Sequence, residues 1–101
     1  MTIKEQAAKV LPDAKNYLDI LSTDDTTGDK KLLGILERGM NRINDSSGAE
    51  HDYTKEARPR ELLFDYARYA RANALEEWED AFLSEILFLA HSVQIGAVSD
   101  D

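Results

Sequence analysis

The sequence predicts an all-α fold, a small bundle of four to five helices that ends in a long C-terminal helical segment, straight or kinked. Residues 58–95 contain no Gly and a single Pro near the start, and the good helix formers Ala, Leu, Glu and Arg fill the rest. Apolar residues elsewhere recur at intervals of three and four, which is helical spacing. Clusters of turn-forming residues at 22–29 and 45–57 separate these segments. We therefore expect residues 1–101 to form a single helical domain, which is long enough to bury a core.

The N-terminal part contains two short candidate segments. Residues 1–10 carry apolar side chains at helical spacing and form either a short helix or an arm. Pro12 interrupts any helix that runs through it, or begins a new one, so we expect a helix of about two to three turns over residues 12–21. Residues 22–29 read as a capping loop, because their carboxylates lack the alternating ligand pattern and closing Glu of a calcium loop.

Residues 29–44 give the clearest amphipathic helix of the chain. Its apolar face comprises Leu32, Leu33, Ile35, Leu36, Met40 and Ile43. Gly39 lies on that face, where a missing side chain would let another helix approach closely. Gly34 lies on the polar face and lowers helix stability by about 1 kcal/mol. The composition of residues 45–57 predicts a loop, with Tyr53 as the candidate to hold it against the core.

The long C-terminal segment changes the direction of its apolar face part-way along. One helical stripe contains Leu62, Leu63, Tyr66, Ala70 and Ala74, and a second contains Leu75, Trp78, Phe82, Ile86, Leu89 and Val93. On a helical wheel the two stripes differ by roughly 140°. Either the chain breaks near residues 73–77, or its second half packs against something that the first half does not touch. A fold-back within the chain or a second copy could provide that partner. We expect residues 96–101 to be a flexible polar tail.

Charge is acidic and unevenly placed. The chain has 12 Lys and Arg against 20 Asp and Glu, a formal charge of −8, and such a field repels nucleic-acid phosphates. No Lys or Arg follows Arg71, whereas most of the acidic residues in the C-terminal part do. Local ion pairs on a solvated helix would explain this. So would a subunit with complementary ends, whose head-to-tail contacts form rings or filaments. The candidate interface residues are Arg60, Arg68, Arg71, Glu76, Glu79, Asp80, Trp78 and Phe82.

The chemistry of the side chains argues against catalysis. There is no Cys, which excludes disulfides and thiolate metal sites. His51 and His91 lack partners at metal-ligand spacing, and no Ser has a His at a suggestive position. We therefore expect no enzyme activity, no metal and no cofactor. No apolar run of about 18 residues exists and the N-terminus lacks a signal-peptide core, so we expect a cytoplasmic product without a membrane span.

Two stretches together resemble a known family. AKNYLDILSTDDTTGDKKLLGILERGMNRIND at residues 14–45 and RELLFDYARYARANALEEWEDAFLSEILFL at residues 60–89 resemble the head–tail connector (adaptor) proteins of tailed bacteriophages, in the form found in phages and prophages of Gram-positive bacteria. The matching positions are Lys15, Tyr17, Leu18, Asp29, Leu32, Leu33, Arg60, Glu61, Leu62, Leu63, Tyr66, Arg68 and Asn73. The resemblance covers about residues 11–90 and does not extend to either end.

This resemblance implies a small helical virion protein without catalytic activity, made in the host cytoplasm. About a dozen copies would form a ring beneath the portal and extend the DNA channel toward the tail. Its partners would be the portal protein, its own neighbours and a downstream stopper or tail-completion protein. The residues themselves leave an alternative open, a soluble acidic helical module that binds or inhibits a basic protein partner about one to one.

Overall fold

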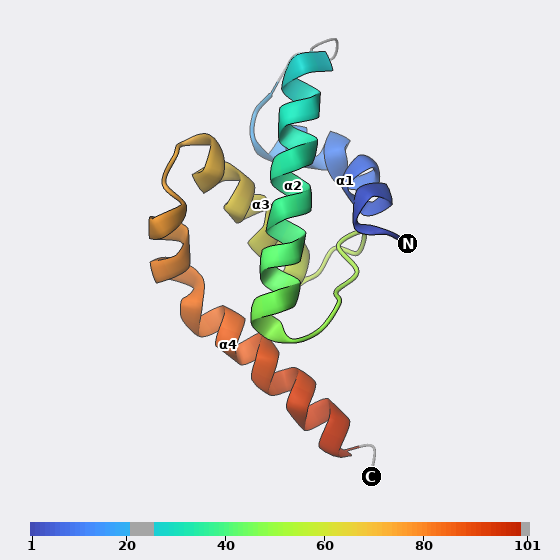
Figure 1. Cartoon of the computed structure of the whole chain (residues 1–101), viewed down its shortest axis with the longest axis vertical. Coiled ribbons are helices and arrows are strands. Elements are labelled where there is room, and N and C mark those ends of the chain that lie inside the picture. Colours follow the sequence, from blue (N-terminus) through green and yellow to red (C-terminus); the bar gives the residue numbers. More distant parts are fainter. Residues whose placement is uncertain (21–25, 100–101) are drawn as a thin grey trace.

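Helix α2 forms the centre of the molecule, and the other three helices pack around it (Figure 1). The computed structural model describes residues 1–20 and 26–99, and the side chains of residues 1–20 and 26–88. The described part of the chain contains no strand and four helices: α1 (Ile3–Tyr17), α2 (Thr26–Ser47), α3 (Arg58–Arg71) and α4 (Leu75–Ser99). The predicted all-α class is therefore confirmed. The molecule measures 50 × 29 × 18 Å, and its long dimension comes from α4, which extends beyond the other helices.

Helix α1 is one continuous element and not the predicted short helix or arm followed by a second helix. A capping box begins it, in which Thr2 and Glu5 bond each other's backbone N–H groups. The helix then runs through Pro12, so the predicted interruption is wrong. Proline removes one backbone hydrogen bond of the helix. The burial of Val10 and Ala14 on either side of it offsets that loss by holding this stretch against α2.

Helix α2 begins three residues earlier and ends three residues later than predicted. Residues 26–29 of the expected capping loop form its first turn, and residues 21–25 lie outside the described part of the chain. The predicted close approach at Gly39 is confirmed. A Cβ atom at Gly39 would lie 2.7 Å from Cδ1 of Tyr66 and 2.8 Å from Cδ1 of Leu63, so the α2–α3 crossing leaves no room for a side chain there.

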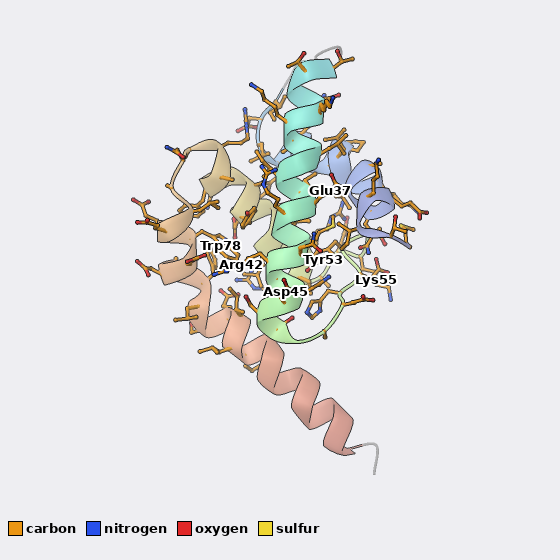
Figure 2. The ribbon with its side chains drawn as sticks, viewed as in Figure 1. Glu37, Arg42, Asp45, Tyr53, Lys55 and Trp78 are labelled. Atoms are coloured by element: carbon orange, nitrogen blue, oxygen red, sulfur yellow. The ribbon has the colours of Figure 1, made fainter. Side chains whose placement is uncertain are left out.

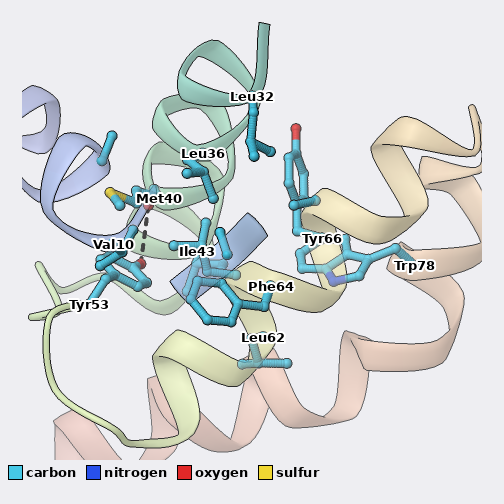
Figure 3. Close-up of a cluster of buried hydrophobic side chains, with 14 of the residues drawn as sticks. Val10, Leu32, Leu36, Met40, Ile43, Tyr53, Leu62, Phe64, Tyr66 and Trp78 are labelled. Atoms are coloured by element: carbon cyan, nitrogen blue, oxygen red, sulfur yellow. Dashed lines mark hydrogen bonds between the residues drawn. The ribbon is translucent and has the colours of Figure 1, made fainter. Parts of the chain in front are cut away.

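The chain breaks between α3 and α4, as one of the two alternatives predicted. Asn73 has a φ of 57°, a left-handed conformation that ends α3 and turns the chain back. Trp78 and Ile86 of the second stripe are consequently buried in the same core as Leu62 and Leu63 of the first. Trp78 of α4 packs edge-on against Tyr66 of α3, with ring centroids 5.1 Å apart at an interplanar angle of 89° (Figure 3). The chain itself therefore covers much of the second stripe.

Tyr53 holds the loop between α2 and α3 against the core, as predicted. Its hydroxyl lies 2.8 Å from Oδ1 of Asn44 and 3.2 Å from the carbonyl oxygen of Met40, the latter bond shown dashed in Figure 3. Its backbone N–H donates to Oε1 of Gln6 on α1, at 2.8 Å. The Tyr53 side chain is fully buried, and this burial raises the pKa of its phenol above the ordinary value. One residue thus joins the loop to both α1 and α2.

Helix α4 continues beyond the predicted end of the C-terminal segment. Residues 96–99 belong to the helix, so the expected tail is shorter than predicted, and residues 100 and 101 lie outside the described part. The first half of α4 packs against α2 and α3, whereas the second half extends away from the other helices (Figure 1).

Candidate functional site

The two aromatic residues that were predicted at an interface belong to the core. Trp78 is fully buried and points toward the body of the molecule (Figure 2). Phe82 is half-buried between Trp78 and Tyr69, with ring centroids at 6.1 and 6.2 Å. Trp78 therefore has no exposed side-chain surface to offer to a partner, and its role at an interface stays a prediction. The physical reason is the turn at Asn73, which folds α4 back onto α3.

Arg60 also acts within the chain. Its side chain forms an ion pair with Asp13 of α1, lies 4.0 Å from Glu56, and sits over the ring of Phe64 with its central carbon 5.2 Å from the centroid. Only 8% of Arg60 is exposed. A guanidinium that is buried and paired contributes to the α1–α3 contact, so its predicted role at an interface between subunits is not supported by its position.

The other two predicted arginines remain on the surface. Arg68 lies 3.4 Å from Asp65 and stacks over Tyr69. Arg71 is exposed, and among the described residues it forms no ion pair. It borders a cavity of about 310 Å³ between the start of α2 and the end of α3. The cavity is lined by Ile20, Gly28, Asp29, Lys31, Leu32, Ile35 and Arg71. We call it the α2–α3 cavity.

Two cross-helix ion pairs attach α4 to the body. Arg42 of α2 binds Glu79 at 2.6 Å, and Arg58 of α3 binds Glu85. The hydrogen bond from Arg58 to Glu85, together with a second one to Glu61, raises the pKa of the Arg58 guanidinium. The predicted interface residue Glu79 is thus occupied within the chain. The ion pairs fix which side of α4 faces inward.

Glu76 and Asp80 lie on the opposite side of α4. Both are exposed, and neither forms an ion pair within the described part of the chain. Leu83 and Leu87 continue the same side of the helix at intervals of three and four residues. We call these four residues the outer stripe of α4. Its charged members were predicted as interface residues, but its leucines were not.

Three of the described large apolar side chains of α4 are exposed, two on the outer stripe and a third, Phe88, on an adjacent face. Leu83, Leu87 and Phe88 are 56%, 59% and 68% exposed, although the neighbouring Ile86 is buried. Sequence reasoning missed these three residues because it assigned a single apolar stripe to α4. The signal was nonetheless present, since the stretch from Phe82 to Phe88 has apolar residues on several faces, which is typical of a helix with more than one packing partner.

A Ser–His pair was also missed. Oγ of Ser47 lies 2.7 Å from Nε2 of His51, and the backbone N–H of His51 donates to Oδ1 of Asn44 at 3.1 Å. Gly48, with a φ of 75°, turns the chain so that His51 returns toward the end of α2. Burial lowers the pKa of His51. Because Ser47 is only 3% exposed, its hydroxyl closes the end of α2 and is not accessible to a substrate.

No group of three or more potential metal ligands occurs in the described part of the chain, and no helix there is long and apolar enough to cross a membrane. No protein-family model matches the sequence, and comparisons with curated proteins and with solved structures give no significant match. The resemblance to connector proteins therefore depends on the motifs at residues 14–45 and 60–89. The exposed surface of α4 is the structural feature that a proposed function has to explain.

Proposed function

We propose that the chain is a structural subunit of a phage head–tail connector, which forms a ring under the portal and extends the DNA channel toward the tail. The observation that carries the proposal is the exposed apolar surface of α4, formed by Leu83, Leu87 and Phe88. Several large exposed apolar side chains on one helix that projects from its own fold are typical of a site for protein association. The order of motifs along residues 11–90 indicates which kind of assembly this is.

The chain cannot cover this surface by itself without losing existing contacts. Rotating α4 about its axis would expose Trp78 and Ile86, which are buried, and would break the ion pairs of Glu79 and Glu85. Exposing a side chain of that size costs about 1.5–3 kcal/mol. A second molecule is the remaining way to remove Leu83, Leu87 and Phe88 from water.

Charge and shape also support this role. With a formal charge of −8, the subunit would repel DNA, which suits the wall of a channel through which DNA must pass freely. A body with one projecting helix suits contacts between unlike surfaces of neighbouring copies. The proposed partners are the portal protein, neighbouring copies and a stopper or tail-completion protein. The role needs no catalysis, metal or cofactor, and places the mature protein in the virion.

Co-expression with the portal protein of the same phage or prophage tests the proposal. We expect rings that contain both proteins, visible by electron microscopy as an added layer under the portal. The chain should also be found by mass spectrometry in mature virions. The proposal is contradicted if no portal gene lies near the gene of this chain. It is also contradicted if the protein binds neither the portal nor itself. A monomer in solution does not, because assembly can depend on the portal.

A second function is favoured by the unpaired carboxylates of Glu76, Glu77 and Asp80, which lie on the exposed side of α4. They would suit a module that masks a basic protein about one to one. Sedimentation with and without the portal distinguishes the two functions, because the masking module stays monomeric in both conditions. Leu83 and Leu87, which a purely electrostatic partner would leave exposed, are the reason for preferring the connector.

A further inference from the structure

We infer that the outer stripe of α4 in one copy docks into the α2–α3 cavity of the next copy. This inference rests on the self-association that the proposed function requires, and it names the two surfaces that meet. Both surfaces are exposed in the single chain, and they differ in charge, since the stripe carries carboxylates and the cavity carries cations. Contact between them is therefore head to tail, which closes into a ring when the rotation between copies permits.

The inserting surface has a defined order along the helix. Glu76 and Asp80 come first and Leu83 and Leu87 follow, all on the side of α4 that faces away from the core. At 1.5 Å per residue the four side chains span about 16 Å of helix. One half of the surface is anionic and the other half is apolar. A matching surface has to be cationic at one side and apolar at the other.

The α2–α3 cavity has that composition. Its apolar wall is formed by Ile20, Leu32 and Ile35, and Lys31 and Arg71 are its exposed cationic residues. Neither cation forms an ion pair among the described residues. The remaining charged residue of the wall, Asp29, is already bound to Lys15 at 2.7 Å. The cavity thus presents two available cations beside an apolar floor.

Charge selects this pairing over the symmetric one. Parallel contact between two α4 helices would bring the carboxylates of Glu76 and Asp80 together, and like charges across an interface cost several kcal/mol. Antiparallel contact would cover Leu83 and Leu87 but would leave those carboxylates without a cation. Docking into the cavity buries the leucines of one copy against the apolar wall of the other. It also brings the carboxylates of the first copy close to the cations of the second.

The position of the two surfaces prevents one chain from joining them internally. The cavity lies at the end of the molecule where α2 begins and α3 ends. Leu83 and Leu87 lie near the middle of α4, which runs toward the opposite end of the molecule (Figure 1). Turning the outer stripe of α4 toward its own cavity would expose Trp78 and Ile86, which are buried, and would break the ion pairs of Arg42 and Arg58. Neighbouring copies can make the contact repeatedly.

Charge reversal tests the pairing. The donor variant carries Glu76→Lys and Asp80→Lys, and the acceptor variant carries Lys31→Glu and Arg71→Glu. We expect each variant to associate with itself at least about tenfold more weakly than the wild type, by mass photometry and sedimentation of the full chain. All four residues are exposed and unpaired, so circular dichroism should show unchanged helix content. The variant with all four reversals should recover self-association, because both surfaces are again complementary.

Matched controls separate a specific contact from an effect of net charge. Lys4→Glu with Lys9→Glu changes the charge as the acceptor variant does, and Asp45→Lys with Glu50→Lys changes it as the donor variant does. These four residues are exposed and lie away from both surfaces. They should leave self-association within about twofold of the wild type.

Disulfide cross-linking gives an independent readout, because the chain contains no Cys. We expect a mixture of the Leu87→Cys and Ile35→Cys variants, which join the apolar end of the stripe to the apolar wall of the cavity, to form a mixed dimer under mild oxidation, faster than either variant forms a dimer alone. A Leu87→Cys homodimer as the main product would replace the inference with a symmetric α4 contact. Rings on the portal that form equally well with the donor and acceptor variants would refute the docking but leave the proposed function intact. If the wild type forms no assembly, alone or on the portal, both proposals fail.

Discussion

Substitution of Gly39 by Ala tests the packing on which the position of α3 depends. A Cβ atom there would lie 2.7 Å from Tyr66 Cδ1 and 2.8 Å from Leu63 Cδ1. Both neighbours are buried, and Tyr66 is also held by its edge-on contact with Trp78, so neither can move away freely. Overpacking of this kind costs about 2–3 kcal/mol. Replacing Gly by Ala within a helix returns about 1 kcal/mol, which leaves a net loss of about 1–2 kcal/mol.

Gly34 provides the matched control on the same helix. The nearest atom to a Cβ there is Nη1 of Arg38 at 3.2 Å, the mobile end of an exposed side chain. Gly34→Ala should therefore stabilise the protein by about 0.5–1 kcal/mol. Urea unfolding followed by circular dichroism measures both variants. If Gly39→Ala is as stable as Gly34→Ala, the close approach of α2 and α3 is wrong.

Three further predictions test other parts of the structure. Ile86→Ala should lower the free energy of unfolding by about 2–4 kcal/mol, whereas Leu87→Ala should change it by less than about 0.5 kcal/mol; equal losses in urea unfolding would contradict the orientation of α4. Tyr53→Phe should lower the free energy of unfolding by about 1–2 kcal/mol, because it removes the hydrogen bonds of the buried hydroxyl to α2. A variant as stable as the wild type would show that these bonds make no net contribution to stability. Burial lowers the pKa of His51 below its ordinary 6.5, so the unfolded chain binds the proton more readily; stability should be complete above pH 6.5 and decline as the pH falls below it. His51→Gln should flatten that part of the pH profile, and an unchanged profile would contradict the assignment.

Local features of the fold were predictable because short-range chemistry determines them. The apolar period and the Gly on the apolar face of α2 indicated the helix and its close neighbour, and the change of stripe indicated a break near residues 73–77 as one of two alternatives. Pro12 misled the prediction. A proline near the last turns of a helix removes only one hydrogen bond, and tertiary packing of Val10 and Ala14 outweighs that loss. The strength of such packing is not visible in the local sequence.

The periodicity of α4 identified the stripe of Trp78 and Ile86 as a packing face, which the structure buries, but it did not identify the partner of that stripe. The partner depends on long-range contacts, namely the fold-back after Asn73 and the ion pair between Arg42 and Glu79, residues 37 positions apart. The Ser47–His51 bond was missed for a similar reason, because it depends on the backbone turn that follows α2.

The turn at Asn73 also governs geometry at a distance. Helix α4 has 25 residues, so at 1.5 Å per residue it is about 37 Å long. The backbone angles of the turn at Asn73 set the direction in which it leaves α3. A change of about 10° in the angle between α3 and α4 would displace the far tip by about 6 Å. In the proposed ring, substitutions near this turn would therefore change the angle between neighbouring copies. The diameter of that ring would then depend on a few backbone angles.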